Sequence, residues 1–159
     1  MRAKKPSESF TLMTEMVFPN DTNALGNLMG GRLLHWMDIA AATAADRHSN
    51  RVVVTASVDS VDFTAPIKLG EVVTIEARVT RAFRTSVEVR IDVYSENIIE
   101  GRRRRCNSAY YTFVAVDQNG RPIPVDPIEP ETPEEIELYE GALRRRDLRL
   151  AAAREKQKS

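Results

Sequence analysis

The sequence contains a single cysteine, Cys106, so an internal disulfide is excluded. This cysteine usage is typical of proteins that work in a reducing cytoplasm. The sequence also lacks an excess of either charge, because 23 Lys and Arg residues balance 23 Asp and Glu residues. Overall charge therefore gives no reason to expect nucleic acid or an anionic membrane as a partner.

Long apolar runs are also missing from the sequence. No segment approaches the roughly 18 apolar residues that a membrane-spanning helix needs. The first nine residues, MRAKKPSES, begin with basic side chains but lack the apolar stretch of a secretory signal. We therefore expect a cytoplasmic protein that does not bind a membrane.

Histidine is scarce, and basic residues cluster in one place. His35 and His48 are the two histidines, and neither has partners at metal-ligand spacing, so we expect no metal. Residues 102–105 read RRRR, which could indicate RNA binding. In an alternating strand these arginines would divide between two faces, which favours a solvated edge or a subunit contact. We interpret Cys106, which follows them, as a small core residue rather than a nucleophile.

The patterns that are present predict one α+β domain. A chain of 159 residues is long enough to bury a core. Alternating, β-branched segments predict strands at 9–18, 51–63, 71–83, 85–97 and 105–117. Between the first two, apolar residues at helical spacing predict a helix from Gly30 to about His48. The expected fold is a long helix covered by an antiparallel sheet of five to six strands.

The ends of the chain differ in composition from this domain. We expect residues 1–9 to be flexible and residues 10–120 to form the domain. The prolines of residues 121–132 predict an extended arm. Residues 133–159 are strongly charged, with Glu early and Arg late, which predicts a surface helix.

One acid stands among apolar residues of the predicted helix. Asp38 falls at the border between the apolar and polar faces, beside Leu34 and Ala45. One interpretation is an ordinary acid on the helix surface. The other is a carboxylate at the mouth of an apolar groove, where desolvation would raise its basicity.

The start of the same helix offers a second kind of chemistry. Free N–H groups near Gly30 and Gly31, with the positive end of the helix dipole, could polarise a carbonyl oxygen. Glycine would let a ligand approach the main chain, although the two glycines could equally serve only to start the helix. Gly31 and Asp38 lie about 10 Å apart along the axis. If both act on one substrate, the acid comes most simply from an antiparallel second copy, which predicts a two-fold dimer.

Five motifs in order carry a family resemblance. They are PNDTNALGNLMGG, LLHWMDIAA, VVTASVDSVDF, IKLGEVVTIEARVTRAFRTSVEV and AYYTFVAVD. On them the chain resembles the hotdog-fold acyl-CoA thioesterases, and in particular the bacterial relatives of tandem-hotdog animal enzymes that hydrolyse cytosolic acyl-CoA and acetyl-CoA. The resemblance covers residues 10–118, with a weaker match in ALRRRDLRL at 142–150.

The resemblance implies a fold, an assembly and an activity. It implies a long helix wrapped by a curved sheet, and dimers with a continuous sheet and paired sites between antiparallel helices. A trimer of dimers is expected in the same way. The implied reaction is hydrolysis of acyl-CoA to a carboxylic acid and coenzyme A, without a cofactor. The alternative is a sensor of the same fold that binds acyl-CoA without hydrolysing it.

The resemblance also implies roles for single residues. Asp38 matches the catalytic acid, Asn23 an asparagine that holds water or substrate, and Gly31 an N–H donor to the thioester carbonyl. Some relatives carry His where this chain has Met29, which leaves the carbonyl more dependent on main-chain donors. Asp38 could activate water as a general base or attack the carbonyl directly, and the sequence does not choose between these routes.

The implied binding path for coenzyme A lies elsewhere in the chain. It includes two strand segments, an arginine near the C-terminus and the first helical glycine: Ala56, Ser57 and Val58; Thr85, Ser86 and Val87; Arg146; and Gly30. An arginine fork suits the phosphates of coenzyme A. The alternative for these residues is ordinary strand and turn hydroxyls and an exposed helix charge.

Overall fold

One antiparallel sheet of five strands organises the computed structural model, which describes residues 1–59, 61–63 and 65–158. The strands are β1 (Thr11–Met16), β2 (Val52–Asp59), β3 (Val72–Ala82), β4 (Ser86–Asn97) and β5 (Arg102–Val116). Their order across the sheet is β1-β3-β4-β5-β2, which leaves β1 and β2 as the edges. Each predicted strand overlaps one of them, so the α+β prediction is confirmed. Residues 60 and 64 of the predicted domain, and residue 159 of the predicted C-terminal helix, lie outside the described residues.

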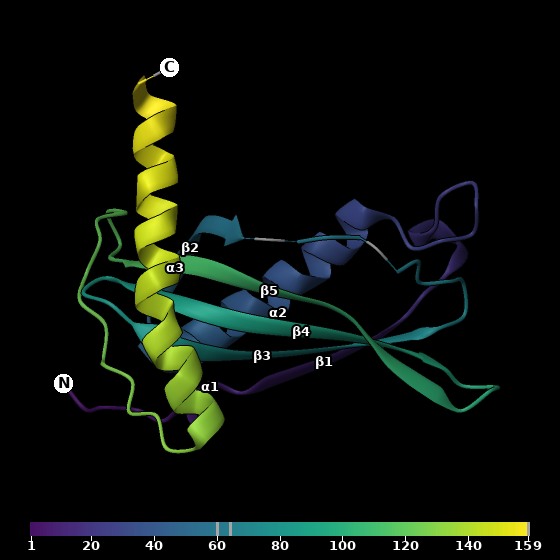
Figure 1. The fold of residues 1–159 in the computed structure, drawn as a ribbon, viewed down its shortest axis with the longest axis horizontal. Helices are drawn as coiled ribbons and strands as arrows, with labels where there is room; N and C mark the ends of the chain where they lie inside the picture. The colour runs from purple at the N-terminus through teal and green to yellow at the C-terminus, as the bar shows by residue number, and fades with distance from the viewer. Residues whose placement is uncertain (60, 64, 159) are drawn as a thin grey trace.

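The long helix α2 (Gly30–Ser49) crosses one face of this sheet (Figure 1). Four of its alanines are at most 1% exposed: Ala40, Ala41, Ala44 and Ala45. These small side chains let the helix axis lie close to the sheet. The side chains of the sheet that face the helix come from every second position of β3, β4 and β5. Asn50, in the left-handed conformation with φ 55°, ends the helix.

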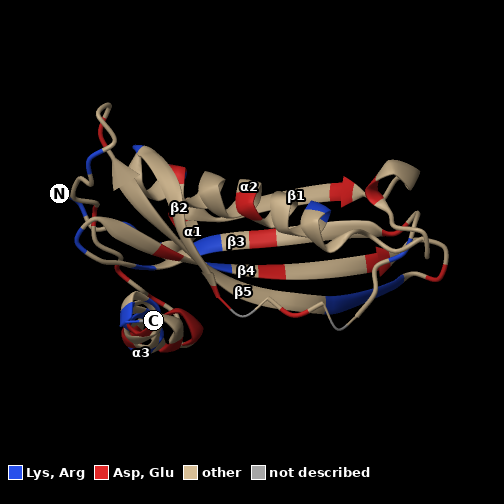
Figure 2. Cartoon of the chain, turned by 90° about the horizontal axis from the view of Figure 1, so that it is seen from above, with Lys and Arg blue, Asp and Glu red and all other residues tan. Residues whose placement is uncertain are grey.

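The C-terminal helix α3 (Pro133–Lys158) packs on the other face of the sheet. Arg145 of α3 forms an ion pair with Glu88 of β4. The residues on either side of Glu88, Val87 and Val89, face the core on the α2 side. Neighbouring strand residues point to opposite faces, so α2 and α3 must cover opposite sides. Figure 2 shows α3 end-on beside the sheet, away from α2. No described helix is both long and apolar enough to cross a membrane.

The N-terminal residues are packed, in contrast to the flexible segment expected from composition. Residues Pro6–Ser9 form the short helix α1, and a single 3-10 turn, η1, follows β1 at Pro19–Asp21. Lys4 is 6% exposed, and its ammonium donates to the carbonyl of His48 at 2.5 Å and to Oδ1 of Asn50 at 2.7 Å. The last carbonyls of a helix lack partners within it, so a cation at the end of α2 satisfies them.

His48 lies in the last turn of α2, near the predicted end of the helix, and is 0% exposed. Its Nε2 lies 2.7 Å from the carbonyl oxygen of Asp126, in the proline-rich segment. The segment after the sheet therefore folds back over the end of α2, which periodicity within the helix could not reveal.

The RRRR run forms the exposed start of β5. Arg105 pairs with Asp92 at 2.5 Å, and the guanidinium of Arg103 lies 4.0 Å from the ring centre of Tyr94. Cys106 is half-buried, and its Sγ lies 3.1 Å from the hydroxyl of Ser95. The exposure of these arginines agrees with a solvated edge, and Cys106 is partly buried and packs against the hydrophobic core.

Candidate active site

The acid singled out in the sequence faces the edge strand β2. Asp38 is half-buried in the middle of α2, and its Oδ1 accepts a hydrogen bond of 2.9 Å from the hydroxyl of Thr55. Sequence reasoning did not single out Thr55. A bulge between Thr55 and Ser57 shifts the register of β2. Because of this shift, the alternation of apolar and polar residues does not reveal which face of the sheet Thr55 occupies.

A buried tyrosine lies near the same acid. Tyr111 of β5 is 1% exposed, and its hydroxyl is 3.5 Å from the carbonyl oxygen of Leu34, one turn before Asp38. Burial and, to a smaller extent, the charge of Asp38 raise the pKa of Tyr111 to about 12. The tyrosine therefore stays protonated, and the surroundings of Asp38 combine apolar packing with hydroxyl groups.

The start of α2 leaves main-chain donors open. The N–H groups of Arg32 and Leu33 both bond to the carbonyl of Met29 at 3.1 Å, and Met29 N–H bonds to the carbonyl of Asp21. Within the described residues, the N–H groups of Gly30 and Gly31 have no hydrogen-bond partner. These two donors can bind a carbonyl oxygen or an anion.

The two glycines differ in what surrounds them. A Cβ at Gly30 would lie 3.4 Å from the ring of Phe63, which is an ordinary van der Waals contact, so packing alone does not require glycine there. Among described atoms, nothing lies within 4 Å of a Cβ built on Gly31, which is exposed. A side chain at Gly31 would therefore leave the protomer undisturbed but would fill the space through which a ligand reaches its N–H group.

Asn23 shapes the turn before α2. Its Oδ1 accepts bonds from the N–H groups of Leu25 and Asn27, at 2.9 and 3.2 Å. Asn23 and Gly30 line one cavity of about 310 Å³, together with Leu33 and Phe63. Asp38 and Gly31 are not among the residues that line it. One protomer thus brings Asn23 to the helix start and places the acid elsewhere, two turns along α2.

The two strand segments expected to bind coenzyme A lie at one end of the sheet, on β2 and at the start of β4, with β5 between them. Ala56 is the extra residue of the β2 bulge, and Ser57 and Val58 line a groove beside α3. Ser57 is paired with Thr112, and Thr112 with Glu88, next to Val87. The Val87 side chain is 1% exposed and belongs to the core, whereas Thr85 and Ser86 are half-exposed.

Arg146 lies beside the turn between β3 and β4. Its guanidinium carbon is 4.9 Å from the ring centre of Phe83, two residues before Thr85. Arg146 therefore lies near the Thr85 segment. The groove at Ala56 is lined by other residues of α3. In the described part of the chain, no three His, Cys, Asp or Glu side chains gather where they could hold a metal ion.

Comparison with known proteins gives a consistent family. The family model of the thioesterase superfamily matches residues 25–101. The uncharacterized acyl-CoA thioester hydrolase YkhA of Bacillus subtilis is 44% identical over 138 residues, which are 87% of this chain and 80% of that protein.

Solved structures resemble the whole chain. An apo-hexameric acyl-CoA thioesterase is 42% identical with a TM-score of 0.92, over 96% of this chain and 98% of that chain. An acyl-CoA hydrolase from Staphylococcus aureus, solved in complex with butyryl coenzyme A, coenzyme A and coenzyme A disulfide, is 36% identical. Its TM-score is 0.92, over 99% of this chain and 96% of that chain.

Proposed function

The chain belongs to the thioesterase superfamily and within it to the acyl-CoA thioester hydrolases, and we propose that it hydrolyses acyl-CoA to a carboxylic acid and coenzyme A. The observation that carries this proposal is the pairing of Asp38 with Thr55 on the face of α2 that meets the edge strand. A carboxylate held in one orientation by a hydrogen bond suits the activation of water.

In this proposal, two protomers supply one site. Gly31 N–H of one protomer donates to the thioester carbonyl oxygen, and Asp38 of the second takes a proton from water. The water oxygen bonds to the carbonyl carbon, the carbon–sulfur bond breaks, and the proton passes to the departing thiolate. Asn23 lines the cavity at the helix start, which supports a role in holding water or substrate there. The hydrolysis needs no cofactor.

The exposed edge of the sheet supports the two-protomer arrangement. Three valines of β2 are exposed to water: Val52 by 69%, Val54 by 48% and Val58 by 44%. An apolar edge strand with unpaired main-chain groups is a natural site for pairing with another strand. We propose that β2 pairs with β2 of a second copy, and that dimers assemble into a hexamer, as the apo-hexameric neighbour does. The single cysteine supports a cytoplasmic location.

The test is thiol release from acetyl-, butyryl- and longer-chain acyl-CoA by the wild-type protein and by Asp38→Asn. Loss of a general base lowers kcat by about 10²- to 10⁴-fold. Coenzyme A binding and the circular dichroism spectrum should stay unchanged, which separates catalysis from folding. Wild-type protein that binds acyl-CoA without releasing thiol would identify a sensor instead. Mass spectrometry of acid-quenched enzyme checks the route, since direct attack by Asp38 would leave an acyl-enzyme.

A further inference from the structure

The C-terminal helix crosses the sheet strand by strand and continues past its edge. The carbonyl of Tyr139 accepts a bond of 3.0 Å from Arg81 of β3, and Arg145 forms its ion pair with β4. Further along the helix, Arg149 lines a cavity of about 510 Å³ together with residues 56–59 of β2. Figure 1 shows α3 lying across the strands, with its C-terminal end beyond β2. Because β2 is an edge of the sheet, no described strand of this chain lies under that end.

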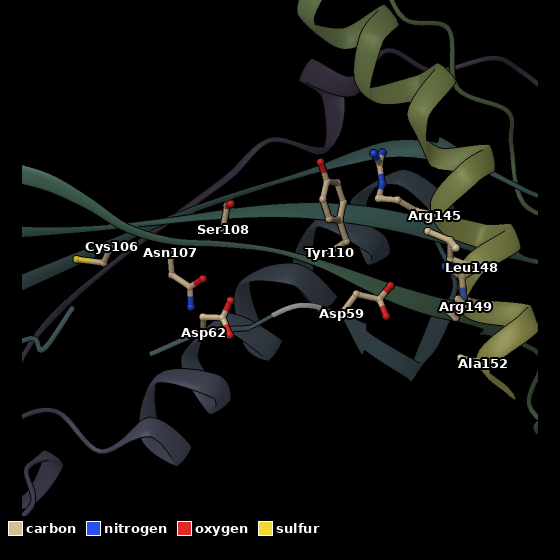
Figure 3. Close-up of a pocket in the computed structure, with 10 residues that line it drawn as sticks. All are labelled: Asp59, Asp62, Cys106, Asn107, Ser108, Tyr110, Arg145, Leu148, Arg149 and Ala152. Atoms are coloured by element: carbon tan, nitrogen blue, oxygen red, sulfur yellow. The ribbon is translucent and has the colours of Figure 1, made fainter. Parts of the chain in front are cut away.

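The last part of α3, residues 150–158, is exposed at every position. We call it the projecting segment. The face of the helix that meets the sheet continues into it, since Arg149, Ala152 and Ala153 line cavities beside β2. In Figure 3, Arg149 and Ala152 line the groove from the helix, and Asp59 lines it from the strand. Helices in proteins owe most of their stability to packing, so a helical end of this length calls for a contact outside its own chain.

The edge strand also carries apolar side chains that its own helix leaves uncovered. Thr55 bonds to Asp38 on the α2 side, so alternation turns Val54 and Val52 towards the face on which α3 lies. These valines are 48% and 69% exposed, and neither lines the cavities beside α3. The helix of the same chain therefore lies over the later half of β2 and leaves the earlier half open to water.

Pairing of β2 with a second copy brings these two surfaces together. Two-fold antiparallel pairing over the whole strand, Val52–Asp59, places residues 57–59 of one copy opposite residues 52–54 of the other. The helix α3 leaves its own strand at residues 56–59, so the next strand under it is the earlier half of β2 of the second copy.

The length of the projecting segment fits this arrangement. A helix rises about 1.5 Å per residue, and neighbouring strands lie about 4.8 Å apart, so three helical residues advance one strand. The next strand beyond the one at Arg149 therefore falls under Ala152 and Ala153. Residues 150–158 span about 12 Å, which is enough to cross two strands.

We propose that the projecting segment crosses the seam of the dimer and packs on Val52 and Val54 of the second copy. This proposal rests on the proposed function, because it takes the β2–β2 pairing given there. Two-fold symmetry produces the contact twice in each dimer. It removes from water two exposed apolar surfaces of the protomer, the valines of β2 and the Leu150–Ala153 part of α3. The dimer is then held by exchanged helix ends as well as by paired strand edges.

Disulfide cross-linking tests the contact directly. In a Cys106→Ser background, we combine Val54→Cys with Ala153→Cys and oxidise the purified protein. Two cysteines form a bridge only when their Cα atoms lie within about 7 Å. We expect a covalent dimer on a non-reducing denaturing gel, whereas a bridge within one chain would keep the mass of one chain. The matched control, Val54→Cys with Leu143→Cys, places the second cysteine on the part of α3 that lies over its own sheet, and it should give no covalent dimer.

A pair of identical substitutions measures what the contact contributes. Ala153→Glu places a carboxylate against the valines, and the control Ala151→Glu places it on a side of the helix that lines neither cavity. Analytical ultracentrifugation should show a dimer Kd that rises about tenfold or more in Ala153→Glu, because a buried charge without a partner is costly. The dimer Kd of Ala151→Glu should equal that of the wild-type protein.

The outcomes separate this inference from the proposed function. A wild-type dimer that releases thiol, but shows neither the Val54–Ala153 cross-link nor a difference between the two glutamate variants, would overturn the inference alone. Covalent dimers from a protein that releases no thiol from acyl-CoA would refute the hydrolase function alone. A wild-type monomer would overturn the inference together with the β2 pairing on which it rests.

Discussion

At the scale of the residue, Thr55 fixes the orientation of Asp38. Its hydroxyl donates to Oδ1 at 2.9 Å, so one carboxylate oxygen is held by the edge strand. We expect Thr55→Val, which keeps the shape but removes the donor, to lower kcat about tenfold to hundredfold, because small errors of position are costly in catalysis. Steady-state thiol release measures this effect.

The matched control for Thr55 is Thr55→Ser, which keeps the hydroxyl. It should retain most of the wild-type kcat, whereas the valine variant should not. If both variants lost activity equally, packing of the methyl group on the edge strand would explain the loss. The hydrogen bond to Asp38 would then have no catalytic role.

His48 makes stability depend on pH. Burial lowers the pKa of its ring from the ordinary value of 6.5, with Lys4 lowering it further and the carbonyl of Asp126 raising it. Between the lowered pKa and 6.5 the unfolded chain binds more protons than the folded one, so the free energy of unfolding rises with pH. This contribution is complete above pH 6.5 and is lost as the pH falls through the folded-state pKa.

The thermal unfolding midpoint measured from pH 5 to pH 8 checks the role of His48. The wild-type midpoint should fall on acidification, and the fall should be shallower in His48→Gln, which cannot bind the extra proton. His35, which is exposed on the same helix, supplies the control variant His35→Gln. If the unfolding midpoint of His48→Gln fell with pH as steeply as that of the wild-type protein, His48 would not be the group responsible for the pH dependence.

At the scale of the element, one ion pair attaches α3 to the sheet. Glu88 is 0% exposed, and it accepts bonds from Arg145 and from the hydroxyl of Thr80 at 2.6 Å. Removing the arginine leaves a buried carboxylate without its cation. We expect Arg145→Met to lower the free energy of unfolding by roughly 2–4 kcal/mol and to speed proteolysis within residues 133–158.

A double-mutant cycle tests whether this pair is the cause. Glu88→Gln removes the buried charge, so adding it to Arg145→Met should recover part of the lost stability. Denaturant unfolding of the wild-type protein, both single variants and the double variant gives the interaction energy. Strictly additive effects would mean that Arg145 stabilises α3 through its packing on Tyr110 instead.

Some elements could be predicted from sequence because their signals are local. The alternation of the four later strands and the alanine face of α2 follow from side chains that must meet one core. The bulge at Ala56 could not be predicted, since it depends on how β2 pairs with β5. The docking of α3 was equally hidden, because a helix with charges all around its surface does not show that Arg145 meets a buried Glu88.

At the scale of the whole molecule, the chain holds complementary halves of the proposed site. Sequence spacing along α2 separates Gly31 from Asp38, and the folded protomer keeps them apart, with Asn23 and Gly30 at one cavity and Asp38 at β2. No amino-acid pattern within one chain encodes the contact between two copies directly. The roles of Asn23 and of the segments at Ala56 and Thr85 come from the resemblance to a family. The spacing of residues along the chain could not have predicted those roles.

If two protomers share each site, two inactive variants should restore activity when mixed. Gly31→Val blocks the donor without disturbing its own protomer, since a Cβ there meets nothing within 4 Å among described atoms. A mixed dimer of Gly31→Val with Asp38→Asn has one intact site out of two. After complete subunit exchange at equal concentrations, half of the dimers are mixed, so about one quarter of the wild-type activity should return.

Subunit exchange must be shown independently, for example by native mass spectrometry of one isotope-labelled variant. With exchange complete, a site built within a single protomer predicts no recovery, because every chain then carries one defect. Val54→Lys, which places a charge on the exposed edge of β2, should prevent dimers in size-exclusion chromatography and abolish activity together with assembly. A monomeric Val54→Lys protein with full thiol release would refute the shared site, whatever the family resemblance implies.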